Sequence, residues 1–344
     1  MIKLRKIIAA MLSMILFCGC GGTSAQKMEV TYFAMDTVMS FRVLGNNAAA
    51  EAAFAGLGGM LGKYEKKWSV TDPESVIAAA NRGESVVLDP QTAELIQFAL
   101  EMNELTDGAL DITMYPVLRE WGFTTGEYKV PDDDRIAELL MLTGCEKVQL
   151  SDSVLSLADG AQIDLGAVAK GYAGDLISEH FRECGVTSAL LDLGGNIHTI
   201  GSNPDGTPWR LGIRSPFGEG NIAVLELSDK AAVTSGGYER YFTENGVDHS
   251  HILDPKTGAP ADSGLVSVTI VGAEGRLCDA LSTALYVMGA EAAERLWQEQ
   301  GGFDMILIES NGDMLITEGL ENMLVPTDAF NGELVVLRNK ALLD

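Results

Sequence analysis

Short strand-like segments, many of them following one another directly, constrain the fold of this chain most strongly. They are separated either by a few Gly, Pro, Asn or Asp residues, as hairpins require, or by helices. The expected strands cover 28–45, 148–150, 154–157, 162–164, 188–196, 209–216, 221–228, 230–237, 264–272 and a hairpin over 303–319. Asn311-Gly312 favours a type I′ turn in that hairpin. The pattern predicts an α+β fold with mixed or antiparallel sheets and packed helices, rather than a doubly wound parallel sheet.

The helices between these strands have recognisable ends. They are expected over 47–68, 89–108, 135–144, 166–184 and 278–289. Asn47 is the expected N-cap of the first helix, and Asp89 that of the second, with Pro90 at its first position. No short repeat, low-complexity stretch or clean linker divides this part of the chain, which is therefore expected to form one domain.

The N-terminus has the anatomy of a bacterial lipoprotein leader. A basic start precedes a short apolar run, 7–17, and Gly19 stands just before Cys20. The sequence predicts a signal peptide over 1–19, lipidation of Cys20, a linker over 20–28 and a folded domain over 29–344. It predicts a protein anchored by lipid to the cell membrane on its extracytoplasmic face. Ordinary secretion with soluble release is the alternative.

Composition excludes some classes of function. The chain has 344 residues and a formal net charge of −25, with 49 acidic against 24 basic residues. A nucleic-acid-binding protein would need a basic face, so this class is not expected. Cys145, Cys184 and Cys278 show no metal-ligand spacing. They are expected to be small buried side chains.

The apolar helix over 278–289 carries two oxygen-bearing side chains on one face. Asp279 and Thr283 are four residues apart, which places them one helical turn from each other. In one interpretation Asp279 is the N-cap and Thr283 bonds back to a carbonyl. In the other, the pair holds a hard cation such as Mg²⁺, which prefers oxygen ligands and often shares them with phosphates.

Two further motifs combine conformational freedom with charge. The segment "DLGAVAKGYAGD" (164–175) joins a strand to a helix start, where Lys170 could help bind phosphate; a packed helix with a solvated lysine is the alternative. In "HSHILDPKTGAP" (249–260), His249 and His251 alternate on an extended segment. A histidine there could donate to an anion or act as a general base, or simply make a structural hydrogen bond.

The order of the motifs resembles that of the FAD:protein FMN transferases, the ApbE family. Seven segments occur in the family's order: "GALDITMYPV…WGF", "DLGAVAKGYAGD", "LLDLGGNIHTIG", "WRLGIRSP", "TSGGYERYF", "HSHILDPKTGAP" and "CDALSTALYVMG". The resemblance extends from about Val30 to the C-terminus. One departure is "AMDT" at 34–37, where many members have Met-Gly-Thr.

The resemblance implies a site and a fold. A metal ion, expected to be Mg²⁺, would be held by Asp279, Thr283 and the main-chain carbonyl of Ala167. The flavin nucleotide would contact Met35, Trp68, Ala109, Leu110, Asp111, Asp164, Lys170 and His251. The implied fold is α+β, with two related halves of the T-fold kind.

The resemblance also implies the reaction. The enzyme would cleave FAD and attach FMN by a phosphoester bond to a threonine or serine of an acceptor flavoprotein, with AMP released and His251 assisting the attack. The expected acceptors are flavoprotein subunits of membrane electron-transfer complexes, modified at a Ser/Thr-Gly-Ala-Ser/Thr-like site. The alternatives are an Mg²⁺-dependent FAD pyrophosphatase that yields FMN and AMP, and a non-catalytic flavin-binding lipoprotein.

Overall fold

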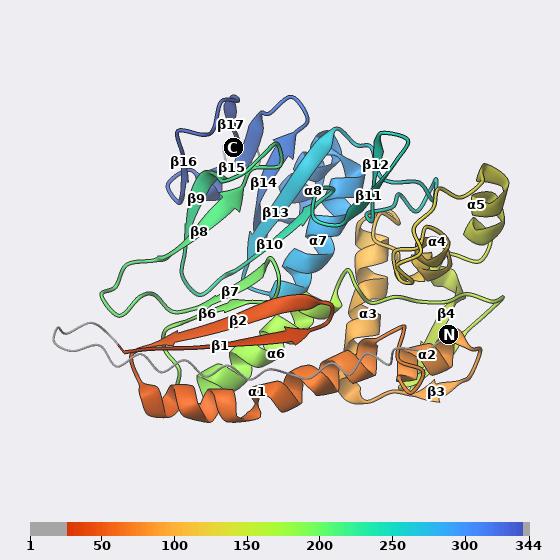
Figure 1. Ribbon diagram of the computed structural model, residues 1–344, viewed down its shortest axis with the longest axis horizontal. Helices are drawn as coiled ribbons and strands as arrows, with labels where there is room; N and C mark the ends of the chain where they lie inside the picture. The colour runs from red at the N-terminus through yellow and green to blue at the C-terminus, as the bar shows by residue number, and fades with distance from the viewer. Residues whose placement is uncertain (1–25, 340–344) are drawn as a thin grey trace, which may run out of the picture.

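A nine-stranded sheet forms the centre of the computed structural model, which describes residues 26–339 (Figure 1). Its strand order is β1-β2-β6-β7-β10-β13-β14-β15-β17, antiparallel throughout except for the parallel pair β15 and β17. The strands are β1 (Lys27–Ala34), β2 (Thr37–Leu44), β6 (Ala189–Asp192), β7 (Asn196–Ile200), β10 (Ala231–Gly236), β13 (Leu265–Gly272), β14 (Phe303–Glu309), β15 (Met314–Thr317) and β17 (Leu334–Leu337). The expected leader, with Cys20, lies outside the described residues.

The sheet consists of two like halves, as the resemblance implied. In each half two strands lead into two helices, which lead into two more strands, and the second strand pairs with the third. The first half uses α1 (Asn47–Trp68) and α6 (Ala169–Glu183). The second uses α7 (Gly275–Met288) and α8 (Ala290–Gln300). The expected α+β class is therefore confirmed.

Insertions interrupt this duplicated core. Between α1 and α6 lie α2 (Val76–Asn81), β3 (Val86–Val87), α3 (Pro90–Leu105), α4 (Tyr115–Glu120), α5 (Asp133–Leu140), β4 (Val148–Ser151) and β5 (Val154–Leu157). Between β7 and β10 lie β8 (Trp209–Arg214) and β9 (Asn221–Leu227), which form a three-stranded sheet with β16 (Leu324–Pro326). The hairpin of β11 (Tyr241–Glu244) and β12 (Val247–Ser250) is inserted before β13.

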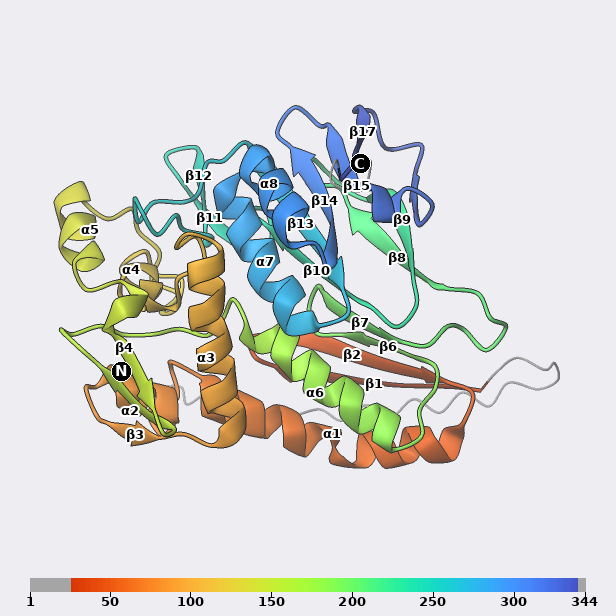
Figure 2. The same cartoon turned by 180° about the vertical axis from the view of Figure 1, so that it is seen from behind.

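The two faces of the central sheet are covered differently. Helices α6, α7 and α8 lie against one face (Figure 2), and Phe181 of α6 packs beside Phe41 of β2 there. The β16-β9-β8 sheet packs over the other face of the second half, where its Leu225 shares a buried cluster with Ile306. No helix within residues 26–339 has the length and apolar character needed to span a bilayer.

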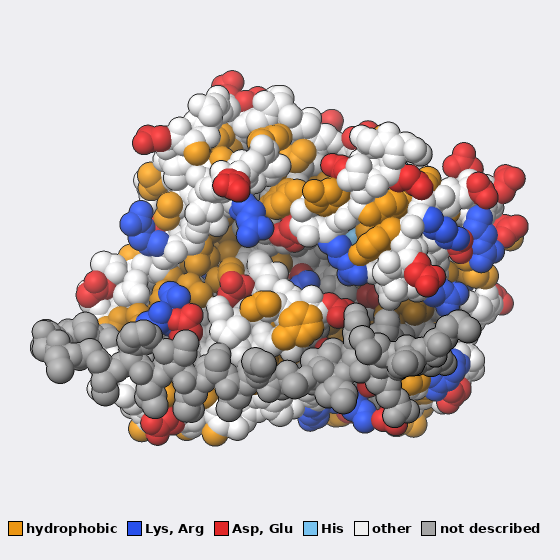
Figure 3. Space-filling view, viewed as in Figure 1, with side chains coloured by type: hydrophobic (Ala, Val, Ile, Leu, Met, Phe, Trp, Pro, Cys, Tyr) orange, Lys and Arg blue, Asp and Glu red, His pale blue; other side chains and the backbone are white. Residues whose placement is uncertain are grey.

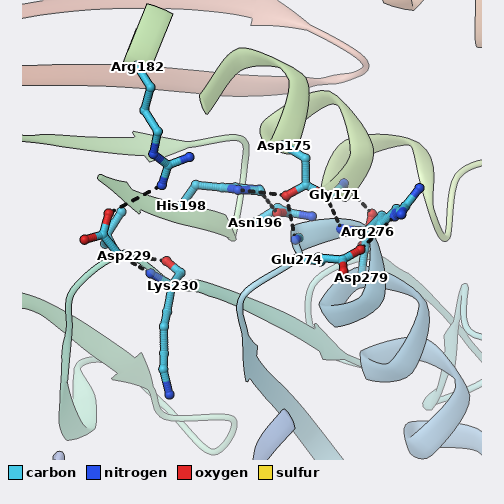
Figure 4. A network of polar contacts seen from close by, with 12 residues as sticks. Gly171, Asp175, Arg182, Asn196, His198, Asp229, Lys230, Glu274, Arg276 and Asp279 are labelled. Atoms are coloured by element: carbon cyan, nitrogen blue, oxygen red, sulfur yellow. Dashed lines mark hydrogen bonds and ion pairs between the residues drawn. The ribbon is translucent and has the colours of Figure 1, made fainter. Parts of the chain in front are cut away.

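The N-terminal parts of α6 and α7 approach each other so closely that only glycine fits. A Cβ on Gly171 would lie 2.3 Å from the carbonyl oxygen of Gly275 and 2.7 Å from the Cβ of Asp279. The helices also cap each other (Figure 4). The Gly171 N–H donates to Asp279 Oδ2 at 2.8 Å, and the N–H groups of Gly275 and Arg276 donate to the Asp175 carboxylate at 2.7 and 2.9 Å. Each helix thus supplies the acidic cap that the other's free N–H groups require.

Several local expectations differ from the structure. Asn46, not Asn47, is the N-cap of α1, and its side chain accepts from Ala48 and Ala49. The segment 162–164 is not a strand, because Ile163 exchanges hydrogen bonds with the Asn81 side chain rather than with a neighbouring strand. The Asn311-Gly312 turn is not type I′: Gly312 has a positive φ of 95°, whereas Asn311 does not.

The ends of several helices agree with the sequence. Asp89 and Pro90 stand at the N-cap and first position of α3, as expected, although the Asp89 carboxylate bonds Lys67 and Thr92 rather than the helix backbone. Helix α6 begins three residues after its predicted start at residue 166. Helix α7 begins three residues before its predicted start at residue 278. Strand β1 begins at Lys27, two residues before the expected domain start.

We expect Gly171→Ala to destabilise the fold by roughly 1–3 kcal/mol, because the new methyl group meets backbone atoms that cannot move aside. The matched control is Gly62→Ala in α1, where nothing lies within 4 Å of the added Cβ. That change should stabilise the protein by about 0.5–1 kcal/mol. Urea unfolding of the leaderless chain measures both, and an unchanged midpoint for Gly171→Ala would contradict the tight crossing.

Candidate active site

A cavity of about 1030 Å³ lies between the two halves of the central sheet, the insertions and strand β8. Figure 3 shows this face of the molecule hollowed near its middle. The cavity is lined by every residue for which a metal or flavin contact was predicted: Met35, Trp68, Ala109, Leu110, Asp111, Asp164, Ala167, Lys170, His251, Asp279 and Thr283. Residues up to 248 positions apart in the chain therefore converge on one space. Their individual roles remain predictions.

Asp279 is a buried carboxylate at the inner end of this cavity, only 5% exposed. Burial raises its pKa to about 6, against the opposing effects of the Lys170 charge and the Gly171 N–H. The N-cap of α7 is Glu274, so the interpretation of Asp279 as the cap of its own helix is wrong. It caps α6 instead, which the sequence could not indicate because the two helices are far apart in the chain.

Thr283 follows Asp279 by one turn on the same face of α7 and also lines the cavity. Its hydroxyl lies 3.3 Å from the Ser235 hydroxyl of β10, which in turn lies 2.8 Å from that of Ser282. Ser282 donates back to the Asp279 carbonyl at 2.9 Å. The hydroxyl of Thr283 is thus placed by the contact between α7 and the central sheet.

The Ala167 carbonyl is a free acceptor at the same place. Ala167 precedes Val168, the N-cap of α6, so its carbonyl lies outside the hydrogen-bond ladder of the helix. Among residues 26–339, no hydrogen bond is donated to the Ala167 oxygen.

A carboxylate, a hydroxyl and an unpaired carbonyl form a donor set suited to a hard cation such as Mg²⁺. Within the same described range, no three His, Cys, Asp or Glu side chains are grouped to hold a metal ion. Any ion at this corner would therefore depend on main-chain and hydroxyl oxygens, and on substrate oxygens that complete the shell.

Asp164 and Lys170 lie on either side of the turn that opens α6. Asp164 Oδ1 accepts from the Gly166 N–H at 2.6 Å, which fixes this turn. Burial raises the pKa of Asp164, while the charges of Arg240 and Lys170 oppose the rise. Lys170 also lowers the pKa of Asp279, so its ammonium group acts on both carboxylates. Lys170 thus provides a positive charge in this part of the cavity, which the two carboxylates offset.

The turn between β1 and β2 borders the cavity on another side. Ala34 pairs with Thr37, so Met35 and Asp36 form a two-residue hairpin turn. Both have positive φ, 49° and 59°, a conformation that glycine adopts more easily. Asp36 therefore adopts a positive φ at the position where many members of the resembled family have glycine. Strained turns of this kind often occur at functional sites.

The remaining predicted flavin contacts are held rigidly by the insertions. Trp68 is 4% exposed, stacks on Tyr64 and donates its indole N–H to Thr92 at 3.1 Å. The backbone of Leu110 is fixed by the side chains of Asn103 and Thr106. Asp111 accepts from both the N–H and the hydroxyl of Thr113. These contacts fix the backbone of 109–111 along the cavity wall.

His251 stands at the base of the β11–β12 hairpin. Its Nδ1 lies 3.0 Å from the Arg240 carbonyl, which can only accept, so Nδ1 carries the proton and donates. Burial and the Arg240 charge lower the pKa of His251 to about 4, which keeps the ring neutral at pH 7. Its Nε2 is then a free acceptor. His249, by contrast, stacks on Phe242 and does not line the cavity.

Some charged residues of the cavity were not identified from the sequence as site residues, and three of them lie in two of the quoted motifs. Arg214, Glu239 and Arg240 all line the cavity. Burial raises the pKa of Glu239 to about 7, against the charges of Lys170 and Arg214. The signal was present in "WRLGIRSP" and "TSGGYERYF", where charges sit between strand residues. Only the folded chain shows that these charges face the predicted site.

Comparisons with known proteins agree with this geometry. The model of the ApbE family matches residues 35–307. The chain is 32% identical to the FAD:protein FMN transferase of Treponema pallidum, over 91% of this chain and 94% of that protein. It is 30% identical to the FAD:protein FMN transferase of Vibrio cholerae, over 84% and 89%. The crystal structure of the ApbE protein from Thermotoga maritima superposes with a TM-score of 0.81 at 33% identity, over 87% and 99%. The chain belongs to the ApbE family.

Proposed function

We propose that this protein is an Mg²⁺-dependent FAD:protein FMN transferase, and that FAD binds in the large cavity. The observation that carries the proposal is the convergence of eleven predicted contacts on that cavity, with the unpaired Ala167 carbonyl beside Asp279. Relatives named FAD:protein FMN transferase, aligned over most of both chains, support the same activity. The enzyme transfers FMN to an acceptor protein and releases AMP.

The oxygens of Asp279, Thr283 and Ala167 would hold the ion. An ion bound there would supply positive charge that stabilises the negative charge of the FAD pyrophosphate. Lys170 adds a positive charge from the start of α6. Met35 and the rigid backbone of 109–111, which line the same cavity, would hold the flavin portion.

The chain's own base for the transfer step is His251. As the acceptor's threonine or serine oxygen forms a bond to the FMN phosphorus, the bond from phosphorus to the AMP oxygen breaks. The hydroxyl proton passes to His251 Nε2, which is free because Nδ1 already donates to Arg240. The carbonyl of Arg240 keeps the ring in this tautomer and orientation.

The leader supports a location for the protein, and the family resemblance supports a class of acceptor. We propose that lipidated Cys20 anchors the protein at the extracytoplasmic face of the cell membrane. The acceptors would be flavoprotein subunits of membrane electron-transfer complexes, which present their hydroxyl on the same side.

We expect Asp279→Asn to abolish both FMN transfer and Mg²⁺-dependent FAD hydrolysis, because both need the same ion. Asp175→Asn is the matched control. Asp175 is also half of the reciprocal cap and also has a pKa raised to about 6 by burial, but it lines a different cavity. Each change should cost roughly 0.3–1 kcal/mol of stability, because Asn keeps an accepting oxygen but loses the negative charge at the helix start. Only Asp279→Asn should remove activity.

The measurement is the acceptor-bound flavin fluorescence after denaturation, with AMP release followed in parallel. Equal loss of activity in both variants would assign Asp279 to capping alone. An active Asp279→Asn variant would remove the metal from the proposal.

We expect His251→Gln to lower the transfer rate by about 10²–10⁴-fold, as loss of a general base does. Mg²⁺-dependent FAD binding should stay close to that of the unchanged enzyme. His249→Gln, in the same hairpin but outside the cavity, should transfer normally. Because the pKa of His251 is lowered to about 4, its base form persists as pH falls through 6.5 and is lost only near 4. NMR titration of the FAD-free enzyme checks this midpoint, and normal transfer by His251→Gln would exclude the base.

We expect mass spectrometry of the membrane fraction to find a mature chain that begins with diacylated Cys20, because Gly19-Cys20 follows the apolar run of the leader. Cys20→Ala should leave the precursor uncleaved and unlipidated. A soluble product that begins at another residue would contradict the anchor.

A further inference from the structure

Strand β8 is an open edge. In the three-stranded sheet the order is β16-β9-β8, so β8 pairs with β9 on one side only. Within residues 26–339, its backbone makes no hydrogen bond outside this pairing. In an antiparallel pair the N–H and C=O groups of alternate residues point away from the partner strand. About half of the β8 backbone groups are therefore directed outward.

The open edge runs along the active-site cavity. Leu211, Gly212, Ile213 and Arg214 all line it, together with the metal and flavin contacts predicted above. None of those predicted contacts lies on β8 itself. They come from the β1–β2 turn, the end of α1, the insertions, the start of α6, the β11–β12 hairpin and α7. The β8 side of the cavity is thus left to another ligand.

The side chains of β8 are compatible with transient main-chain pairing to another polypeptide. Arg210, Gly212 and Arg214 are exposed, while Trp209 and Ile213 anchor the strand in the protein. Exposed charges on an edge strand hinder permanent pairing with another copy of the same chain. Arg210 also pairs with Glu226 across the strands at 3.6 Å, which keeps its side chain on the face of the sheet.

We propose that the acceptor polypeptide enters the site as an extended strand paired to the free edge of β8. This inference rests on the proposed transferase function and adds how the protein substrate is recognised. Main-chain pairing would bind an acceptor loop with little demand on its side chains, and would present one hydroxyl to the phosphorus of bound FAD. Recognition would then lie in the extended backbone and in the small residues around the modified hydroxyl.

The test modifies the acceptor peptide rather than β8, because a side chain added at Gly212 in the middle of β8 would disturb its packing. A Cβ on Gly212 would lie 2.3 Å from the Asn221 side chain. The probes are peptides of about twelve residues with a Ser-Gly-Ala-Thr core, each N-methylated at one backbone nitrogen. They are incubated with the leaderless enzyme, FAD and Mg²⁺. Because strand pairing uses alternate N–H groups, flavin labelling should fall about tenfold at every second position and change little between them.

The labelling results distinguish strand pairing from other modes of acceptor recognition. A loss without a two-residue period overturns strand pairing. An unlabelled parent peptide beside a labelled intact acceptor protein also overturns it, because the segment alone would then not be recognised. If neither is labelled, the proposed transferase function fails, and this inference fails with it.

Amide hydrogen exchange provides a second measurement. The outward N–H groups of β8 should exchange at least about tenfold more slowly when the parent peptide and FAD are bound. Strand β16 forms the other edge of the same sheet, away from β8, and serves as the internal control. Protection of both edges or of neither would contradict the proposal.

Discussion

The close approach of α6 and α7 is the contact on which the rest of the site depends. Gly171 and Gly275 let the two backbones meet, and each helix then receives a carboxylate from the other. The Gly171 N–H, one of the free donors at the start of α6, donates to Asp279, and this hydrogen bond joins the two helices close in sequence to the unpaired carbonyl of Ala167. Lys170 is the second residue of the same helix.

Much of this arrangement was visible in the sequence. The alternation of hairpins and helices predicted the fold class, and the ordered motifs predicted eleven residues that share one cavity. Spacing along one helix correctly placed Asp279 and Thr283 on a common face. Helix starts and stops were correct to within about three residues where Pro, Gly or Asp marked them.

The predictions that were wrong depend on contacts between residues that are distant in the chain. The hydrogen-bond partner of Asp279, Gly171, lies 108 residues away in the chain. The local sequence therefore could not show that Asp279 caps α6 rather than its own helix. Residues 162–164 have strand composition, yet the Asn81 side chain takes the hydrogen bonds of Ile163. Arg214 reaches the cavity from strand β8 and Glu239 from the turn between β10 and β11, and only tertiary structure brings their charges together.

The reciprocal caps place two carboxylates at one helix crossing but in different surroundings. Asp175 lies on the second helix of the first half and Asp279 on the first helix of the second half, so the duplication does not relate them to each other. Beside Asp175 the buried ring of His198 lies 3.7 Å away, and it fills the space so tightly that Gly174 has no room for a Cβ. Beside Asp279 the space is left open to the large cavity. One kind of contact at a helix start therefore has two different settings: Asp175 lines a smaller, separate cavity beside a buried histidine, whereas Asp279 lines the cavity where the predicted ion and nucleotide contacts converge.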